Sequence, residues 1–259
     1  MRVLVVRHHE EDSAGLIGEA FAGRGAELTT HLFPADGPLP SADGFDHVVL
    51  LGAKWSIYDR DSVGSWIESE LDWLQRADES GIPVLGICFG AQALTTAFGG
   101  VVERAPAVEL GWKCVSPSGN GTLLDILGPG PWFQFHEDRC VLPEGAVLHA
   151  ENGTGVQVFS IGRNLGVQFH PEIDGEQLSG WLDDETRQML ENAGIDPDGL
   201  VAETVAMESE SRLRAVAVVG AALALAHTAE RPDEAPSRSR GAQEEVVVTA
   251  PGARRSDLG

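Results

Sequence analysis

The chain has 259 residues, of which 42% are hydrophobic, and it carries a formal net charge of −22 at pH 7. This length suits one large α/β domain with a tail, and the apolar content is enough for a core. The charge argues against nucleic acid as a partner, because phosphate contacts need a basic surface. The longest uncharged apolar run, residues 215–226, is too short to span a bilayer, and no secretory signal is visible. We therefore expect no membrane partner and a cytoplasmic location.

The cysteines and lysines exclude several kinds of site. Cysteines at positions 88, 114 and 140 form no C-x-x-C pair, which argues against a disulfide framework or a zinc site. The two lysines, Lys54 and Lys113, do not follow a glycine, so no Walker A loop is present. We expect no metal, no cofactor and no site that could activate a substrate with ATP.

Strands and helices alternate over the first hundred residues. Strands are predicted at residues 2–7, 26–33, 45–51 and 82–87, and helices over residues 13–24, from Asp61 or Ser62 onward, and over 91–98. This alternation is typical of an open, mostly parallel, twisted sheet with helices on both faces.

The middle of the chain has shorter strands, and its end has helices and a tail. Mixed or antiparallel strands extending the sheet are predicted at residues 101–104, 111–116, 133–142, 146–150 and 156–161, with a short helix near 122–127. A further strand at 165–170 and helices over 176–192 and 198–227 complete a domain predicted at residues 1–227. Residues 228–259 have little core material and are expected to be a disordered tail.

Cys88 lies between a predicted buried strand and a predicted helix, in the sequence Gly-Ile-Cys-Phe-Gly. This is the thiol version of the nucleophile elbow, in which small residues flank the nucleophile at a sharp turn. The positive end of the following helix favours thiolate over thiol. The alternative is that Cys88 is only a small buried hydrophobe, as many free cysteines are. Cys114 and Cys140 lie in apolar strand contexts and are interpreted in that way.

A cysteine nucleophile needs a base to move its proton, and that base needs an orienting acid. His170 and Glu172 supply such a pair at the end of a predicted strand, in the sequence His-Pro-Glu. Alone, this tripeptide would favour a surface turn, but together with Cys88 it favours a catalytic set at the carboxyl edge of the sheet. The histidines of residues 8–12, HHEED, are interpreted as part of a solvated loop, because adjacent side chains on a strand end point in opposite directions.

These two motifs, GICFGAQ at residues 86–92 and QFHPE at residues 168–172, resemble those of class I (triad-type) glutamine amidotransferases. The likeness covers residues 44–180 well, and within the family it is to standalone chains similar to the glutaminase domain of GMP synthase. Residues 55–59 and 135–138 support it. The resemblance implies a flavodoxin-like, class I glutamine amidotransferase type of sheet with a mixed or antiparallel extension.

The resemblance also implies a mechanism. Cys88 would attack the side-chain amide of L-glutamine to form a γ-glutamyl thioester. His170, oriented by Glu172, would protonate the departing ammonia and then activate water. Implied oxyanion and substrate-binding groups are Gly52, Ala53, Phe89 (through its N–H), Gln92, His136, Glu137 and Asp138.

Two departures from the family pattern affect the implied binding groups. The family usually has Gly-Gly in the oxyanion turn, where this chain has Gly52-Ala53, and alanine tolerates a positive φ less readily. The family often has His-Gly-Asp where this chain has His-Glu-Asp at residues 136–138.

Three functions remain open at this point. Because no ATP site is visible, a glutaminase would pass its ammonia to a synthetase partner in trans. The same triad could instead cleave γ-glutamyl amides or peptides without a partner. A non-catalytic binding protein on the same fold is disfavoured by the intact set of Cys88, His170 and Glu172.

Overall fold

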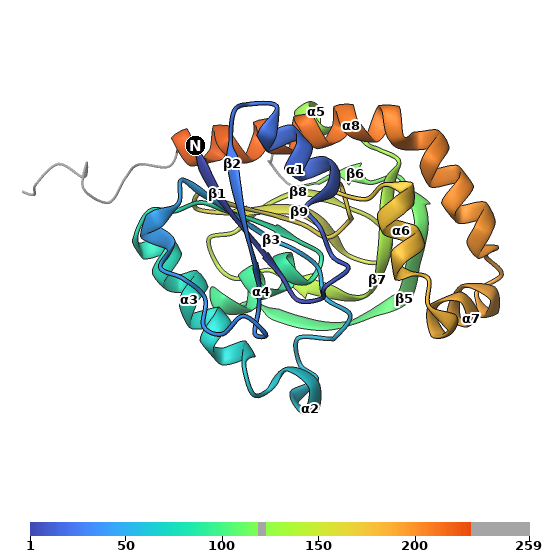
Figure 1. Cartoon of the computed structure of the whole chain (residues 1–259), viewed down its shortest axis with the longest axis horizontal. Coiled ribbons are helices and arrows are strands. Elements are labelled where there is room, and N and C mark those ends of the chain that lie inside the picture. Colours follow the sequence, from blue (N-terminus) through green and yellow to red (C-terminus); the bar gives the residue numbers. More distant parts are fainter. Residues whose placement is uncertain (119–122, 229–259) are drawn as a thin grey trace, which may run out of the picture.

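The computed structural model describes residues 1–118 and 123–228, and an eight-stranded sheet lies at its centre (Figure 1). The strand order is β2-β1-β3-β4-β10-β9-β8-β6. The bounds in this order are Glu27–Leu32, Arg2–Arg7, His47–Leu50, Val84–Ile87, Asn164–Val167, Val156–Ile161, Val147–Glu151 and Ser116–Pro117. The first five strands are parallel and the last three are antiparallel to their neighbours. The predicted α/β fold with an antiparallel extension is therefore confirmed.

A second sheet is formed by β5 (Val101–Lys113) and β7 (Trp132–Val141), which pair in antiparallel fashion. The prediction that these segments extend the main sheet was wrong. The two segments predicted at 101–104 and 111–116 fall mainly within one long strand, whose register shifts between Arg104 and Glu109. The strand is continuous because β7 supplies pairing partners on both sides of this irregularity.

Helices cover both faces of the main sheet (Figure 1). On one face, α1 (Gly15–Ala22), α5 (Leu123–Leu127) and α8 (Pro197–Thr228) share a core cluster with Val3 and Val5 of β1. On the other, α3 (Ile67–Glu79) and α4 (Phe89–Ala97) share a cluster with Leu4 and Val6. Successive β1 side chains thus enter opposite layers, as the two-residue repeat of a strand requires, and both layers are apolar because the sheet is covered on both sides.

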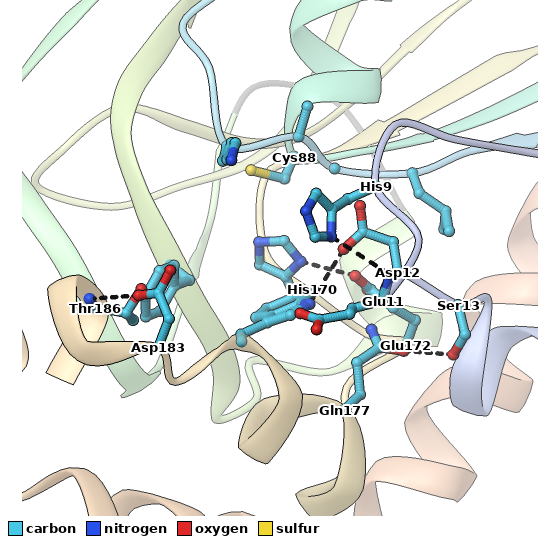
Figure 2. Close-up of a pocket in the computed structure, with 16 residues that line it drawn as sticks. His9, Glu11, Asp12, Ser13, Cys88, His170, Glu172, Gln177, Asp183 and Thr186 are labelled. Atoms are coloured by element: carbon cyan, nitrogen blue, oxygen red, sulfur yellow. Dashed lines mark hydrogen bonds and ion pairs between the residues drawn. The ribbon is translucent and has the colours of Figure 1, made fainter. Parts of the chain in front are cut away.

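Two predicted helices are each broken into two. The helix expected from Asp61 or Ser62 is α2 (Arg60–Val63) followed by α3, and the one expected over 176–192 is α6 (Gly175–Trp181) followed by α7 (Asp184–Asn192). The second break occurs where Asp183 caps α7, its side chain accepting a hydrogen bond from the N–H of Thr186 at 2.8 Å. Asp183, at this break, is among the residues that line a cavity (Figure 2).

The last helix, α8, has 32 residues and ends at Thr228, so the predicted tail lies outside the described residues apart from its first position. Within the described part of the chain, no helix combines the length and the apolar character needed to cross a membrane.

Candidate active site

Cys88 lies at the turn between β4 and α4, and its backbone is unusual. Its φ of 51° is the one positive φ of a non-glycine residue in the described part of the chain. A Cβ on Gly86 would collide with the backbone at Gly90 and Ala91, and a Cβ on Gly90 would collide with the carbonyl oxygen of Leu50. The flanking glycines therefore allow the sharp turn to pack against β3, and the strained turn is the predicted nucleophile elbow.

His170 and Glu172 lie next to Cys88 in a cavity at the carboxyl edge of the sheet (Figure 2). The Nδ1 of His170 is 2.7 Å from Oε1 of Glu172, and these residues are only 5% and 1% exposed. Burial alone lowers the pKa of His170, but the charge of Glu172, the neighbouring Cys88 and their hydrogen bonds raise it well above its ordinary value. The ring is thus stabilised as an imidazolium beside the sulfur.

The free nitrogen of this histidine is available for chemistry. Nε2 of His170 is buried and makes no hydrogen bond of full geometry among the described residues, although the adjacent Cys88 interacts with the ring. The backbone of Glu172 is held in place by α1, because its main-chain carbonyl oxygen accepts a hydrogen bond of 2.9 Å from the N–H of Leu16 at the start of this helix. The pair can therefore hold or move a proton at Nε2, facing the reacting sulfur.

Gln168 connects the two buried cysteines of the chain. Its Nε2 donates to Sγ of Cys88 at 3.6 Å, and its Oε1 accepts from Sγ of Cys140 at 4.0 Å. Burial raises the pKa of the Cys140 thiol to about 12, so this thiol remains a protonated donor. The interpretation of Cys140 as buried packing agrees with its 4% exposure, whereas Cys114 is exposed, contrary to expectation. Gln168 was not predicted as a site residue, although it belongs to the QFHPE motif.

The cavity has a volume of about 170 Å³ and contains the predicted triad. Gly52 and Ala53, the predicted oxyanion turn, also line it, and a Cβ on Gly52 would lie 3.2 Å from Cε1 of His170. Phe89 begins α4 directly after Cys88, as an N–H donor at the elbow requires. The other lining residues are His9, Glu11, Asp12, Ser13, Leu51, Lys54, Phe135, Gln177, Trp181, Asp183 and Thr186.

Four predicted substrate-binding residues do not line this cavity. Gln92 is buried within α4, and residues 136–138 lie in β7, in the region where a strand was predicted. The ring of His136 is held by Asp138 O at 2.9 Å, Gln134 Oε1 at 3.0 Å and Glu109 Oε2 at 3.2 Å.

The neighbours of His136 are equally engaged. Burial alone raises the pKa of Glu109, but hydrogen bonds from His136, Thr154 and Asn152 lower it to about 2. Glu137 forms an exposed ion pair with Arg104 at 2.8 Å.

Asp138 connects β7 to the loop that follows the oxyanion turn. Its carboxylate accepts hydrogen bonds from the Ser56 hydroxyl at 2.5 Å and the Tyr58 hydroxyl at 2.7 Å. Asp138 therefore supports the loop at residues 52–58, whereas its own side chain lies outside the cavity lining.

The loop after β1 contributes more than was predicted. His9, Glu11 and Asp12 line the cavity. The interpretation of residues 8–12 as a solvated loop was wrong for His8, which is buried, whereas His9, Glu10 and Glu11 are exposed. Burial raises the pKa of Asp12, the Glu172 charge adds to this, and Trp181 Nε1 donates to its carboxylate at 3.2 Å. The available signal was position, because these residues directly follow a parallel strand at its carboxyl end.

No metal site accompanies these groups in the described ranges: no three His, Cys, Asp or Glu side chains are grouped so that they could hold an ion. What the geometry brings together is a thiol at a strand–helix turn, a histidine–carboxylate pair and a glycine-containing turn over the sulfur. This combination is typical of an amide-cleaving enzyme with a cysteine nucleophile.

Comparison with known proteins identifies the family. Residues 16–188 match the model of the glutamine amidotransferase class-I family, and the chain belongs to this family. A solved glutamine amidotransferase from Thermotoga maritima superposes with a TM-score of 0.77 at 25% identity, covering 86% of this chain and 98% of that one.

Two curated relatives differ in what they are named for. The chain is 31% identical over 183 residues to a gamma-glutamyl-L-1-hydroxyisopropylamide hydrolase from Pseudomonas sp., covering 63% of this chain and 60% of that protein. It is 28% identical over 167 residues to a probable GMP synthase from Leptospira interrogans, covering 62% of this chain and 26% of the synthase. The chain thus spans less than two thirds of each of these relatives.

Proposed function

We propose that this protein hydrolyses the side-chain amide of L-glutamine through a γ-glutamyl thioester on Cys88 and delivers ammonia to an acceptor on a partner protein. The observation that carries the proposal is the buried His170–Glu172 pair, 2.7 Å apart, beside Cys88 in the cavity. Family membership supports amide chemistry at this site.

The proposed acylation step uses the imidazolium of His170. The Cys88 thiolate attacks the amide carbon, and the carbonyl oxygen becomes an oxyanion held by the N–H groups of Phe89 and Ala53. Collapse of this intermediate breaks the C–N bond, and Nε2 of His170 gives its proton to the departing nitrogen. The products are ammonia, neutral His170 and a γ-glutamyl thioester.

The proposed deacylation step returns the enzyme to its starting state. Neutral His170 takes a proton from water as the water oxygen attacks the thioester carbon. The C–S bond then breaks, which releases glutamate and restores the thiolate–imidazolium pair. Glu172 keeps the ring oriented and stabilises its charge throughout.

Charged groups in the cavity suit the amino-acid end of such a substrate. Lys54 offers a cation for the α-carboxylate, while Asp12 and Asp183 offer carboxylates for the α-ammonium group. The family-implied roles of Gln92, His136, Glu137 and Asp138 in holding the substrate remain predictions. For Asp138, an indirect role through Ser56 and Tyr58 agrees with its contacts.

A second candidate is hydrolysis of a substituted γ-glutamyl amide without a synthetase partner. It is favoured by the likeness to the Pseudomonas hydrolase, of which the chain covers 60%, against 26% of the GMP synthase. The two candidates share the triad and the thioester and differ in the group that leaves with the nitrogen.

The test combines covalent labelling with turnover on one sample. The Cys114→Ser variant removes the exposed competing thiol, and a glutamine-mimicking electrophile is then followed by intact-protein mass spectrometry. Ammonia release from glutamine and amine release from a panel of γ-glutamyl amides are measured in parallel. One label at Cys88 together with glutamine turnover supports the first proposal, and turnover of substituted amides alone supports the second.

Matched variants show whether the signal comes from this site. Cys88→Ala is expected to lose both the label and the turnover, whereas Cys140→Ala is expected to retain both. Ammonia release that persists in Cys88→Ala would exclude the thioester mechanism. A protein that shows no label and no turnover, alone or with a captured synthetase, would instead be a non-catalytic binding protein.

A further inference from the structure

A second histidine–carboxylate pair is buried behind the oxyanion turn, apart from the triad. His8 follows β1 directly, and Glu70 lies in the first turn of α3. The side chains of both are 0% exposed, and Nε2 of His8 lies 3.1 Å from Oε1 and 3.3 Å from Oε2 of Glu70. Two ionisable groups are costly to bury, so this pair calls for an explanation that apolar packing alone does not give.

The other nitrogen of His8 faces the oxyanion turn. Its Nδ1 lies 3.4 Å from the carbonyl oxygen of Gly52, at the long end of the hydrogen-bond range. The partners of the ring, a carboxylate and a carbonyl oxygen, are both acceptors, so the geometry favours an imidazolium, which donates from both nitrogens. Burial alone lowers the pKa of His8, but Glu70 and the Gly52 carbonyl raise it above its ordinary value.

Aromatic rings fix the plane of this imidazolium. His8 stacks on Trp66 with the ring centroids 5.3 Å apart, and it lies edge-on to Phe89 at 5.1 Å. A cation over a tryptophan face is stabilised by the ring quadrupole. His8 is thus held between α3, α4 and the loop at residues 52–53, and it has little freedom to turn away from Gly52.

Peptide geometry turns this contact into a constraint on the active site. The carbonyl of Gly52 and the N–H of Ala53 belong to one planar trans peptide unit, so they point in opposite directions. When the carbonyl oxygen is fixed toward His8, the N–H of Ala53 is directed away from His8. Gly52, Ala53 and Cys88 line the cavity whereas His8 does not, and a Cβ built on Gly52 would lie 3.7 Å from the Cβ of Cys88. The side of the turn opposite His8 is therefore taken as the side of the sulfur.

We propose that His8, held by Glu70, binds the Gly52 carbonyl and thereby orients the N–H of Ala53 toward the oxyanion formed at Cys88. His8 and Glu70 are positioning residues, because neither lines the cavity. This contact also accounts for alanine at position 53. Because His8 holds the Gly52 carbonyl, the orientation of the Gly52–Ala53 peptide does not depend on glycine at position 53. This inference rests on the proposed amide hydrolysis.

The test uses a matched pair of double variants. His8→Leu/Glu70→Leu removes both partners, so no buried charge is left unpaired. His8→Asn/Glu70→Leu differs only by an amide whose N–H can again donate to the Gly52 carbonyl. His47→Leu serves as the control, because His47 is a buried histidine of β3 that does not contact the site.

Four quantities are measured for each variant in the Cys114→Ser background. They are kcat and KM for the γ-glutamyl substrate that the wild type cleaves, the rate of Cys88 alkylation by iodoacetamide, and inhibition by the aldehyde analogue of glutamine. The sulfur of Cys88 adds reversibly to the aldehyde carbon, and the former aldehyde oxygen then occupies the oxyanion site as an oxyanion. Alkylation by iodoacetamide needs no such site. The expected result for the Leu/Leu variant is a fall of about 10- to 100-fold in kcat and in aldehyde affinity, because one donor is misdirected.

The same variant is expected to keep its KM and its alkylation rate within about twofold, and the Asn/Leu variant is expected to recover most of the lost kcat. Unchanged kcat in Leu/Leu, or an alkylation rate that falls in parallel with kcat, would overturn the inference. If the Leu/Leu variant fails to fold, the Asn/Leu variant is compared with His47→Leu instead. Retained kcat in Asn/Leu then supports the positioning role of His8. A loss of kcat as large as that of a triad variant rejects it. A wild type that cleaves no γ-glutamyl amide rejects the proposed function itself, and this inference with it.

Discussion

Nδ1 of His170 and Oε1 of Glu172 are 2.7 Å apart, although only Pro171 separates the two residues in sequence. The rigid proline allows the carboxylate to return to the ring of the histidine that precedes it. This contact commits Nδ1 to Glu172 and leaves Nε2 for the reacting groups. In the proposed mechanism, Glu172 would therefore set both the orientation and the charge of His170.

Replacing Glu172 should separate these two effects. Glu172→Gln keeps an acceptor for Nδ1 but removes the negative charge, so kcat is expected to fall by about 10²-fold. Glu172→Ala removes both and should cost more, although less than His170→Asn or Cys88→Ala. Steady-state kinetics checks this order, with the exposed Glu176→Gln of α6 as a control that should match the wild type. Equal kcat in Glu172→Gln and wild type would refute the role given to the charge.

The backbone conformation of Cys88 is expected to lower the free energy of unfolding while it holds the sulfur in position for activity. A non-glycine residue in its conformation is strained by about 1–3 kcal/mol, and glycine relieves part of that strain. Cys88→Gly is therefore expected to raise the free energy of unfolding by about 1 kcal/mol relative to Cys88→Ala. Urea unfolding measures the difference, and Ala91→Gly within α4 is the control, expected to lower stability by about 1 kcal/mol. A Cys88→Gly variant less stable than Cys88→Ala would show that the turn is not strained.

Gly90 should tolerate no side chain. A Cβ there meets the backbone of Leu50 in the central sheet, which cannot move aside without breaking strand pairing. Gly90→Ala is expected to lose about 3 kcal/mol or more of unfolding free energy, the upper end for overpacked sites. Gly44→Ala is the matched control, because nothing lies within 4 Å of its Cβ position and its backbone is not left-handed. Thermal unfolding of both variants checks the prediction, which fails if their midpoints are equal.

Acid stability should depend on His47. Burial lowers the pKa of His47 to about 4 from an unfolded value of 6.5, so the unfolded state binds the proton first as the pH falls. The stabilisation by neutral His47 is complete above pH 6.5 and is lost progressively as the pH falls toward 4. The loss is about 2 kcal/mol by pH 5 and about 3 kcal/mol below pH 4. Urea unfolding at pH 7 and pH 5 should show this slope in the wild type and a shallower one in His47→Leu; parallel slopes would contradict the assignment.

Local patterns made most strands of the main sheet predictable. The alternation over the first hundred residues predicted β1, β2, β3 and β4 because each strand carries its own apolar run. The second sheet was not predicted, because the pairing of β5 with β7 joins residues up to 40 positions apart, such as Val101 with Val141. The residue pattern of a single strand does not indicate which other strand it will pair with.

The site divides in the same way. Cys88, His170 and Glu172 were predictable because the motifs that contain them are contiguous in sequence. His8 and Glu70 are 62 residues apart, and Asp12 meets Trp181 across 169 residues. Such pairs leave no periodic signal, so a buried histidine next to an acidic run was interpreted as a solvated loop.

The hydrogen bonds from Ser56 and Tyr58 to Asp138 connect the oxyanion loop to β7 of the second sheet. That loop is therefore anchored at one end to the main sheet, through His8, and at the other end to the small one. A local opening of β5 and β7 would release the loop without unfolding the elbow. Amide hydrogen exchange in β7 and in residues 52–58 should then have a common opening free energy. Under the proposed mechanism, the stability of the two-stranded sheet would determine how often the oxyanion loop is in place for reaction.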